Sequence, residues 1–157
     1  LQIEGKLPQP KHDGSVTYHD PCYLGRIGGE LDAPRDAIGG VAVEAERHGK
    51  DSFCCGAGGG QMWMEMNIGE RMNNIRTEEL LETKPKVIAV ACNFCMTMVD
   101  DGVKAKGQTD DVQVLDLAEL LAQRVLDDEV DAGGTEGASA SGNSATEGTD
   151  VSDSPSA

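Results

Sequence analysis

The chain has 157 residues, a length that suits one domain and leaves little room for a second. Its formal net charge is −15, and eight acidic but no basic residues follow Arg124. So acidic a chain offers little that could neutralise phosphates, which argues against a nucleic-acid-binding domain. No apolar run approaches the roughly 20 residues that a membrane helix requires, and no signal peptide is recognisable.

The chain begins at Leu1 rather than at methionine, which we take as the mark of a C-terminal piece of a longer protein. Five cysteines without a secretion signal favour a reducing compartment, where thiols stay free for metal or redox chemistry. An odd number of cysteines also fits poorly with a closed disulfide framework. We therefore expect a cytoplasmic location, at the inner face of the membrane if preceding sequence supplies an anchor.

Three short apolar runs predict β-strands. They are Val16–His19, Val87–Ala91 and Val112–Leu115, and the second is a continuous apolar run typical of a buried parallel strand. Helical patterns lie between them. This alternation indicates βα units, so the expected fold is α/β, with a small, mostly parallel sheet and flanking helices.

Two helices can be predicted in some detail. One is expected from about Gln61 to Glu82, because apolar residues there are spaced 4, 4 and 3 positions apart on one face: Met64, Ile68, Met72 and Ile75. The second begins near Asp116, which together with Glu119 predicts an N-terminal cap. The apolar face of this second helix is expected to consist of Leu117, Leu120, Leu121 and Val125.

The composition changes abruptly near Asp127, where Gly, Ser, Ala, Thr, Asp and Glu take over. Such a segment cannot bury enough apolar surface to offset the entropy of ordering. The working domain is therefore expected at residues 12–126, and residues 127–157 are expected to form a disordered acidic tail.

The cysteines fall where strands are expected to end. The five are Cys22, Cys54, Cys55, Cys92 and Cys95. The first follows Val16–His19 across a short turn, the adjacent pair follows Ser52-Phe53, which we expect to close a short extended segment, and the last two follow the buried strand. In open α/β sheets, sites assemble outside the carboxyl ends of the strands, so the three groups are expected to converge there on one site.

The local sequence around the cysteines suits metal binding. Cys92 and Cys95 are expected to open a helix, with both sulfurs on one face at the end where the helix dipole favours anions. Thiolates are the metal-binding form of cysteine, and such surroundings lower the thiol pKa. A glycine-rich run follows Cys54 and Cys55, which leaves backbone N–H groups free to point at sulfur. The alternative is that the cysteines are small hydrophobic residues of the core.

These motifs resemble a known family. The spacing Cys22-x31-Cys54-Cys55-x36-Cys92-x2-Cys95 resembles the cysteine-rich CCG domain of heterodisulfide reductase subunits and related Fe–S oxidoreductases. The segments 18–26, 53–64 and 91–98 most resemble the branch linked to acyl-CoA dehydrogenases and electron-transferring flavoprotein.

The resemblance implies an iron–sulfur domain of an electron-transfer enzyme, with all five cysteines as ligands. It implies a [4Fe-4S] centre of unusual, non-cubane form, and five cysteines are one more than an ordinary cubane takes. The implied partners are other domains or subunits of a redox complex, with electron-transferring flavoprotein as donor and a quinone as acceptor. Relatives that oxidise lactate or glycolate share the same cysteines.

Two other functions stay open at this point. The cysteines could form a structural zinc site that holds an interaction domain together, since some domains of this type resemble zinc binders. Cys92 and Cys95 could instead act as a thiol–disulfide oxidoreductase, which leaves three thiols unexplained. Catalytic residues are not identifiable.

Residues near the cysteines have weaker signals. His19 could hydrogen-bond a cluster sulfur or be a structural histidine, and the second role is favoured. Arg26 could offset cluster charge or pair with a surface carboxylate. Core packing is favoured over a role at the cluster for Trp63 and the surrounding methionines.

Overall fold

The structure is a computed structural model that describes residues 15–39, 43–65 and 68–132. Most of the segment expected as a disordered tail, and residues 12–14 of the expected domain, lie outside this part of the chain. Within the described residues, none of the helices combines the length and the apolar character needed to cross a membrane.

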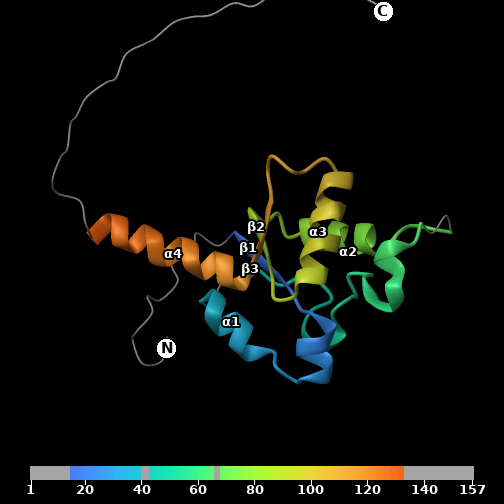
Figure 1. Cartoon of the computed structure of the whole chain (residues 1–157), viewed down its shortest axis with the longest axis horizontal. Helices are drawn as coiled ribbons and strands as arrows, with labels where there is room; N and C mark the ends of the chain where they lie inside the picture. The colour runs from blue at the N-terminus through green and yellow to red at the C-terminus, as the bar shows by residue number, and fades with distance from the viewer. Residues whose placement is uncertain (1–14, 40–42, 66–67, 133–157) are drawn as a thin grey trace, which may run out of the picture.

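A three-stranded parallel sheet lies at the centre of the fold (Figure 1). Its strands β1 (Val16–His19), β2 (Val87–Val90) and β3 (Gln113–Asp116) are arranged in the order β1-β2-β3. The register aligns His19 with Val90, and Val90 with Asp116, so the three strands end at the same level. This confirms the predicted α/β class and brings the three strand ends to one edge.

Helices cover both faces of the sheet. On one side lie α2 (Met72–Leu81) and α3 (Asn93–Ala105), and on the other lie α1 (Asp32–Ile38) and α4 (Leu117–Ala132). Each side has its own buried apolar cluster. The α2/α3 cluster contains Ala45, Leu80, Ile88, Val90, Val99, Val103 and Val112. The α1/α4 cluster contains Val16, Tyr18, Ile38, Ala89 and Leu120.

The predicted cap of α4 is present. The side chain of Asp116 accepts a hydrogen bond from the backbone N–H of Ala118 at 2.9 Å, and the Glu119 carboxylate accepts one from the backbone N–H of Asp116 at 3.0 Å. This reciprocal arrangement is a capping box, which satisfies backbone donors that a helix start leaves free. The helix continues to Ala132, beyond the boundary expected near residue 126.

The helix expected from Gln61 to Glu82 is wrong over its first half. The chain forms a 3₁₀ segment, η3 (Gly58–Trp63), and α2 begins only at Met72. Gly69 explains the break, because its φ is 70°, which an α-helix does not allow, and Gly59 and Gly60 just before Gln61 have φ values of 67° and 77°. Ile68, assigned to the apolar face, is 85% exposed.

The buried face of α2 is largely polar. The Asn73 amide donates to the carbonyl of Met98 at 3.1 Å, and the Thr77 hydroxyl donates to the carbonyl of Val99 at 3.5 Å. Both contacts reach α3, which lies very close at Gly102. A Cβ at Gly102 would lie 2.1 Å from the Thr77 hydroxyl oxygen. Hydrogen bonds and close backbone approach, rather than an apolar stripe, therefore fix α2 against α3.

Candidate metal centre

Two strand ends position three of the cysteines. Cys22 lies just beyond β1, where it starts the π-helical turn η1 (Tyr23–Ile27). Cys92 follows β2 as the N-cap residue of α3, and Cys95 lies in the first turn of that helix. The prediction that Cys92 and Cys95 open a helix is confirmed, and both line the same cavity.

The adjacent pair lies in irregular chain. Cys54 and Cys55 lie between the 3₁₀ segments η2 (Gly49–Asp51) and η3. The extended segment expected to end at Ser52-Phe53 is not a strand in the structure, so this pair does not follow a strand end. Adjacent residues of a strand face opposite sides, whereas the irregular backbone lets both sulfurs face one cavity.

Gly56 shapes the backbone directly after the pair. Its φ is 86°, and an added Cβ would lie 2.9 Å from the Cβ of Met72. Its N–H donates to the Cys54 sulfur at 3.3 Å. Any side chain here would meet both backbone strain and a clash with α2, so glycine allows the turn that brings the pair to the cavity.

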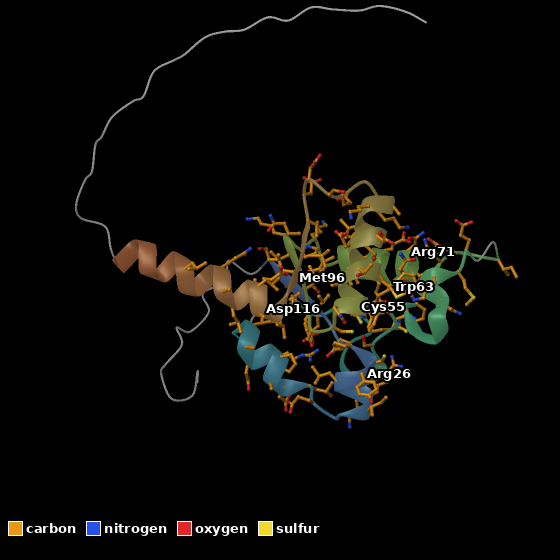
Figure 2. All side chains as sticks on the ribbon, viewed as in Figure 1. Arg26, Cys55, Trp63, Arg71, Met96 and Asp116 are labelled. Atoms are coloured by element: carbon orange, nitrogen blue, oxygen red, sulfur yellow. The ribbon has the colours of Figure 1, made fainter. Side chains whose placement is uncertain are left out.

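All five cysteines line one cavity of about 890 Å³. Its other walls are mainly apolar, and include Pro21, Met62, Trp63 and Phe94. Figure 2 shows Cys55 near the end of α3, above the segment that carries Arg26. The predicted convergence of the cysteines is therefore present, although Cys54 and Cys55 reach the cavity from a loop and not from a strand end.

Asp20 holds the turn before Cys22. Arg35 of α1 donates to its two carboxylate oxygens at 2.8 and 3.0 Å, and the Gly49 N–H donates to one of them at 2.7 Å. Burial alone would raise the pKa of Asp20, but the hydrogen bonds from Arg35 and Gly49 outweigh it and lower the pKa below its ordinary value. One carboxylate thus links α1, η2 and the chain that carries Cys22.

His19 joins the site from the end of β1. It is 1% exposed, and its ligating atoms lie within 4.8 Å of the sulfurs of Cys55 and Cys95. The Nε of Arg76 donates to the His19 Nδ1 at 3.0 Å. Burial lowers the pKa of His19, which favours the neutral ring.

The thiols of Cys55 and Cys95 shift each other's pKa in opposite directions. Hydrogen bonds from Cys95 and from His19 lower the pKa of Cys55, against the opposing effect of burial. The hydrogen bond to Cys55, together with burial, raises the pKa of Cys95. Cys55 is therefore the sulfur of this pair that the protein prepares as a thiolate, the form that binds metal.

Three sequence interpretations need revision. Arg26 donates to the backbone carbonyls of Lys50 and Ser52, so it ties η1 to the chain that leads to Cys54 and does not pair with a carboxylate in the described structure. Trp63 is 79% exposed and lines the cavity, which contradicts the core role favoured for it. His19 is buried as a structural histidine would be, yet it also contacts a cysteine.

The family description "CCG: Cysteine-rich domain" matches residues 16–100. The chain belongs to the CCG cysteine-rich domain family. The match contains every cysteine that lines the cavity, as well as His19 and Arg76. No solved structure matches the chain.

Several curated proteins resemble this CCG domain. "Probable iron-sulfur-binding oxidoreductase FadF" of Bacillus subtilis is 51% identical over 132 residues, which cover 80% of this chain and 19% of the relative. The "EtfAB:quinone oxidoreductase" of Syntrophomonas wolfei is 45% identical over 132 residues, covering 77% and 18%. A subunit of the dihydromethanophenazine:CoB--CoM heterodisulfide reductase from Methanosarcina barkeri is 36% identical over 113 residues, covering 69% and 27%. The chain thus spans about a fifth to a quarter of the length of these relatives.

Sequence reasoning missed Arg76, which is fully buried beside the CCG cysteines. A buried arginine in a helix interior has no distinctive spacing, and the helix that carries it was expected to bury apolar residues instead. The cue available was indirect, since Arg76 and Glu79 are three residues apart and form an ion pair at 3.0 Å.

Proposed function

We propose that this CCG domain is the iron–sulfur electron-transfer module of a larger Fe–S oxidoreductase, and that Cys22, Cys54, Cys55, Cys92 and Cys95 hold the cluster. The observation that carries the proposal is the convergence of all five thiols on one cavity from three separate parts of the chain. Cysteines that served only as small core residues would have no reason to share a cavity.

The donor set suits a cluster. Thiolates are the ligands that Fe–S clusters take, and five are available where an ordinary cubane takes four. We therefore propose a [4Fe-4S] centre of non-cubane form. The surroundings also suit one, because Cys55 is prepared as a thiolate and the Gly56 N–H points at the Cys54 sulfur.

The bound centre would supply one-electron redox chemistry, and the protein would supply its environment. Apolar side chains that include Pro21, Met62 and Phe94 line the cavity and would lower the polarity around the cluster. The Asp20–Arg35 pair and the Arg26 contacts hold the two loops that carry Cys22 and Cys54. The role proposed for these residues is to position the ligands.

A structural zinc site is the second candidate, and one observation favours it. His19, Cys55 and Cys95 place three ligating atoms within 4.8 Å, and zinc takes nitrogen and sulfur ligands together. That trio leaves Cys22, Cys54 and Cys92 without a role, although they line the same cavity. The cluster accounts for more of the site.

Anaerobic reconstitution of the chain with iron and sulfide tests the proposal. We expect about four irons and four sulfides per chain. Replacing Cys55 by Ser should alter or abolish the centre, while a Met96→Leu variant, which changes a residue packed against the α2/α3 cluster, should keep it. An intact four-iron spectrum in Cys55→Ser would assign an ordinary cubane, and stoichiometric zinc without sulfide would favour the structural site.

The proposed partners come from the relatives. For the complete protein, we propose transfer of electrons from reduced electron-transferring flavoprotein towards a quinone, because the relative named EtfAB:quinone oxidoreductase is 45% identical over the CCG domain. Stopped-flow mixing of the oxidised full-length protein with the reduced flavoprotein should bleach the cluster, and a Cys92→Ser control should stay silent. Reduction only during lactate or glycolate turnover would assign the hydroxy-acid branch instead.

A further inference from the structure

Two buried side chains without an assigned role lie behind the cysteine cavity. His19 is 1% exposed and Arg76 is fully buried, and neither lines the cavity itself. They come from β1 and α2, and the two residues are 57 positions apart in the sequence. The Arg76 Nε donates to the His19 ring, and a ligating nitrogen of that ring lies within 4.8 Å of the Cys55 sulfur, so the three side chains follow one another towards the cysteines.

The direction of the hydrogen bond between Arg76 and His19 is fixed by the chemistry of arginine. A guanidinium group has only donors, and the Arg76 Nε lies 3.0 Å from the His19 Nδ1. The Nδ1 atom must therefore accept, so it carries no proton. An imidazolium has no lone pair for this contact, so the ring is neutral and its single proton lies on Nε2. That N–H is the group left to face the Cys55 sulfur.

Arg76 cannot turn away easily from this contact. Its Nη1 donates to the backbone carbonyl of Arg47 at 2.9 Å and lies 3.0 Å from a carboxylate oxygen of Glu79. Glu79 is held in turn by Arg47, through its backbone N–H at 2.7 Å and its guanidinium at 3.1 Å. The arginine is thus fixed on the side away from His19.

We propose that Arg76 is a positioning residue that makes His19 a hydrogen-bond donor to the Cys55 sulfur and prevents it from being a metal ligand. A histidine that ligates through Nε2 needs that nitrogen unprotonated, with its proton on Nδ1. The Arg76 donor opposes that tautomer. The compact trio of His19, Cys55 and Cys95 is therefore two sulfur ligands and one donor, not a three-ligand site.

The consequence for a bound cluster rests on the proposed function, whereas the tautomer does not. An N–H donated to a ligand sulfur stabilises the more negative, reduced state, so it raises the reduction potential. Loss of the donor should lower the potential without removing a ligand.

The first test uses the metal-free chain. With ¹⁵N-labelled histidine, two-bond ¹H–¹⁵N correlation spectra distinguish the two neutral tautomers, and we expect the Nε2–H form for His19. His48, whose Nδ1 lies 2.8 Å from the Ala45 carbonyl oxygen, should show the opposite Nδ1–H form and is an internal control. An Nδ1–H form at His19 would overturn the proposal.

The second test adds zinc. In the wild-type chain, His19 Nε2 should keep its proton when zinc is bound, whereas in Arg76→Met it should become free to lose the proton and ligate. Arg76→Lys retains a charged donor and should restore the wild-type spectrum in part. Direct zinc binding by His19 in the wild-type chain would contradict the proposal.

The third test remains available if Arg76→Met fails to fold. His19→Gln retains an amide donor and His19→Leu does not, so the iron-loaded His19→Leu variant should have the lower reduction potential. Equal potentials with equal iron content would overturn the role of the donor. Failure of both variants and the wild-type chain to bind iron would instead reject the proposed function and leave the tautomer result standing.

Discussion

The two faces of the sheet are built differently. The α1/α4 face buries an apolar cluster in which Leu120 is 5% exposed. The α2/α3 face also has an apolar cluster, but it buries Asn73, Arg76, Thr77 and Glu79 as well. The cysteine site adjoins this second face, because Cys92 and Cys95 lie at the start of α3.

This difference suggests that the α1/α4 cluster mainly sets stability, whereas the buried hydrogen bonds of the α2/α3 face also set the geometry of the site. An apolar cluster is tolerant of volume-conserving change, whereas buried hydrogen bonds have fixed partners and directions. On the α2/α3 face, Asn73 and Thr77 set the distance to α3, and Arg76 orients His19. We expect damage to this face to affect the metal centre, and equal damage to the apolar cluster of the α1/α4 face, away from the Arg35–Asp20 pair, to affect stability alone.

Leu120→Ala should give the largest loss of stability on the α1/α4 face. Truncation of a buried leucine costs about 2–5 kcal/mol, through lost burial and the cavity that remains. Denaturant unfolding should detect this loss, while the iron bound per folded chain should stay unchanged. Leu120→Met is the matched control, with an expected cost of less than about 1.5 kcal/mol. A parallel loss of iron in folded Leu120→Ala would show that the two faces are not separable.

Glu79→Gln tests the buried charges of the α2/α3 face. Burial would raise the pKa of Glu79, but hydrogen bonds from Arg47 and Arg76 lower it below its ordinary value. A carboxylate with a lowered pKa stabilises the fold above its unfolded-state pKa, near 4.3, and this contribution is lost as pH falls through the folded-state pKa. Removing the partner of a buried charge can cost about 3 kcal/mol.

The variant should therefore be less stable than the wild-type chain at pH 7, and the difference should shrink as the pH falls below about 4.3. Unfolding curves at several pH values measure this. Glu78→Gln is the control on the same helix, since the Glu78 side chain is 59% exposed and pairs with Lys106 at the surface. A pH-independent difference would mean that the Glu79 charge is not what stabilises this face.

Local patterns predicted α4 and the start of α3, but neither α1 nor the start of α2. The strands, the cap at Asp116 and the helix start at Asn93 depend on residues close in sequence, and the structure has them. The helix predicted over Gln61–Glu82 was wrong before Met72 because apolar spacing was weighed above Gly69. Tertiary hydrogen bonds decide which face of α2 is buried, and no local pattern encodes them.

In the site, too, features that depend on local sequence were predicted and features that depend on tertiary contacts were not. Convergence of the five cysteines followed from parallel strand ends and the motif spacing. The roles of Arg76 and of the Asp20–Arg35 pair did not, because each joins segments that are brought together only by folding. Single charged residues in a chain with 26% charged residues give no sign of which ones are buried.

Gly102→Ala should disturb the α2/α3 face by a smaller amount. The new Cβ would lie 2.8 Å from the Thr77 Cβ and 3.1 Å from the Asn73 carbonyl oxygen, so α2 and α3 must move apart. Overpacking costs about 1–3 kcal/mol, and the better helix propensity of alanine offsets up to about 1 kcal/mol. Because α2 carries Arg76, iron bound per folded chain should fall as well.

A double-mutant cycle with Thr77→Ala sharpens this test. Removal of the Thr77 hydroxyl relieves the closest contact, 2.1 Å, but leaves the Cβ contact. The pair should therefore be partly compensating, with a coupling energy that denaturant unfolding can resolve. Strict additivity of the two changes would show that the clash at Gly102 is absorbed elsewhere.

The smallest expected effect lies at the start of α4. Asp116→Ala removes the oxygen that accepts from the Ala118 N–H, and should lower the free energy of unfolding by about 1 kcal/mol. Asp116→Asn keeps an acceptor of the same shape and should retain most of the stability, which separates capping from charge. Glu119→Ala removes the other half of the capping box and should also lower the free energy of unfolding. Since α4 packs on the face away from the CCG cysteines, all three variants should bind iron as the wild-type chain does. A cap variant that lost iron while folded would mean that the end of β3, where Asp116 aligns with Val90 of β2, transmits strain to the cysteine-bearing edge of the sheet.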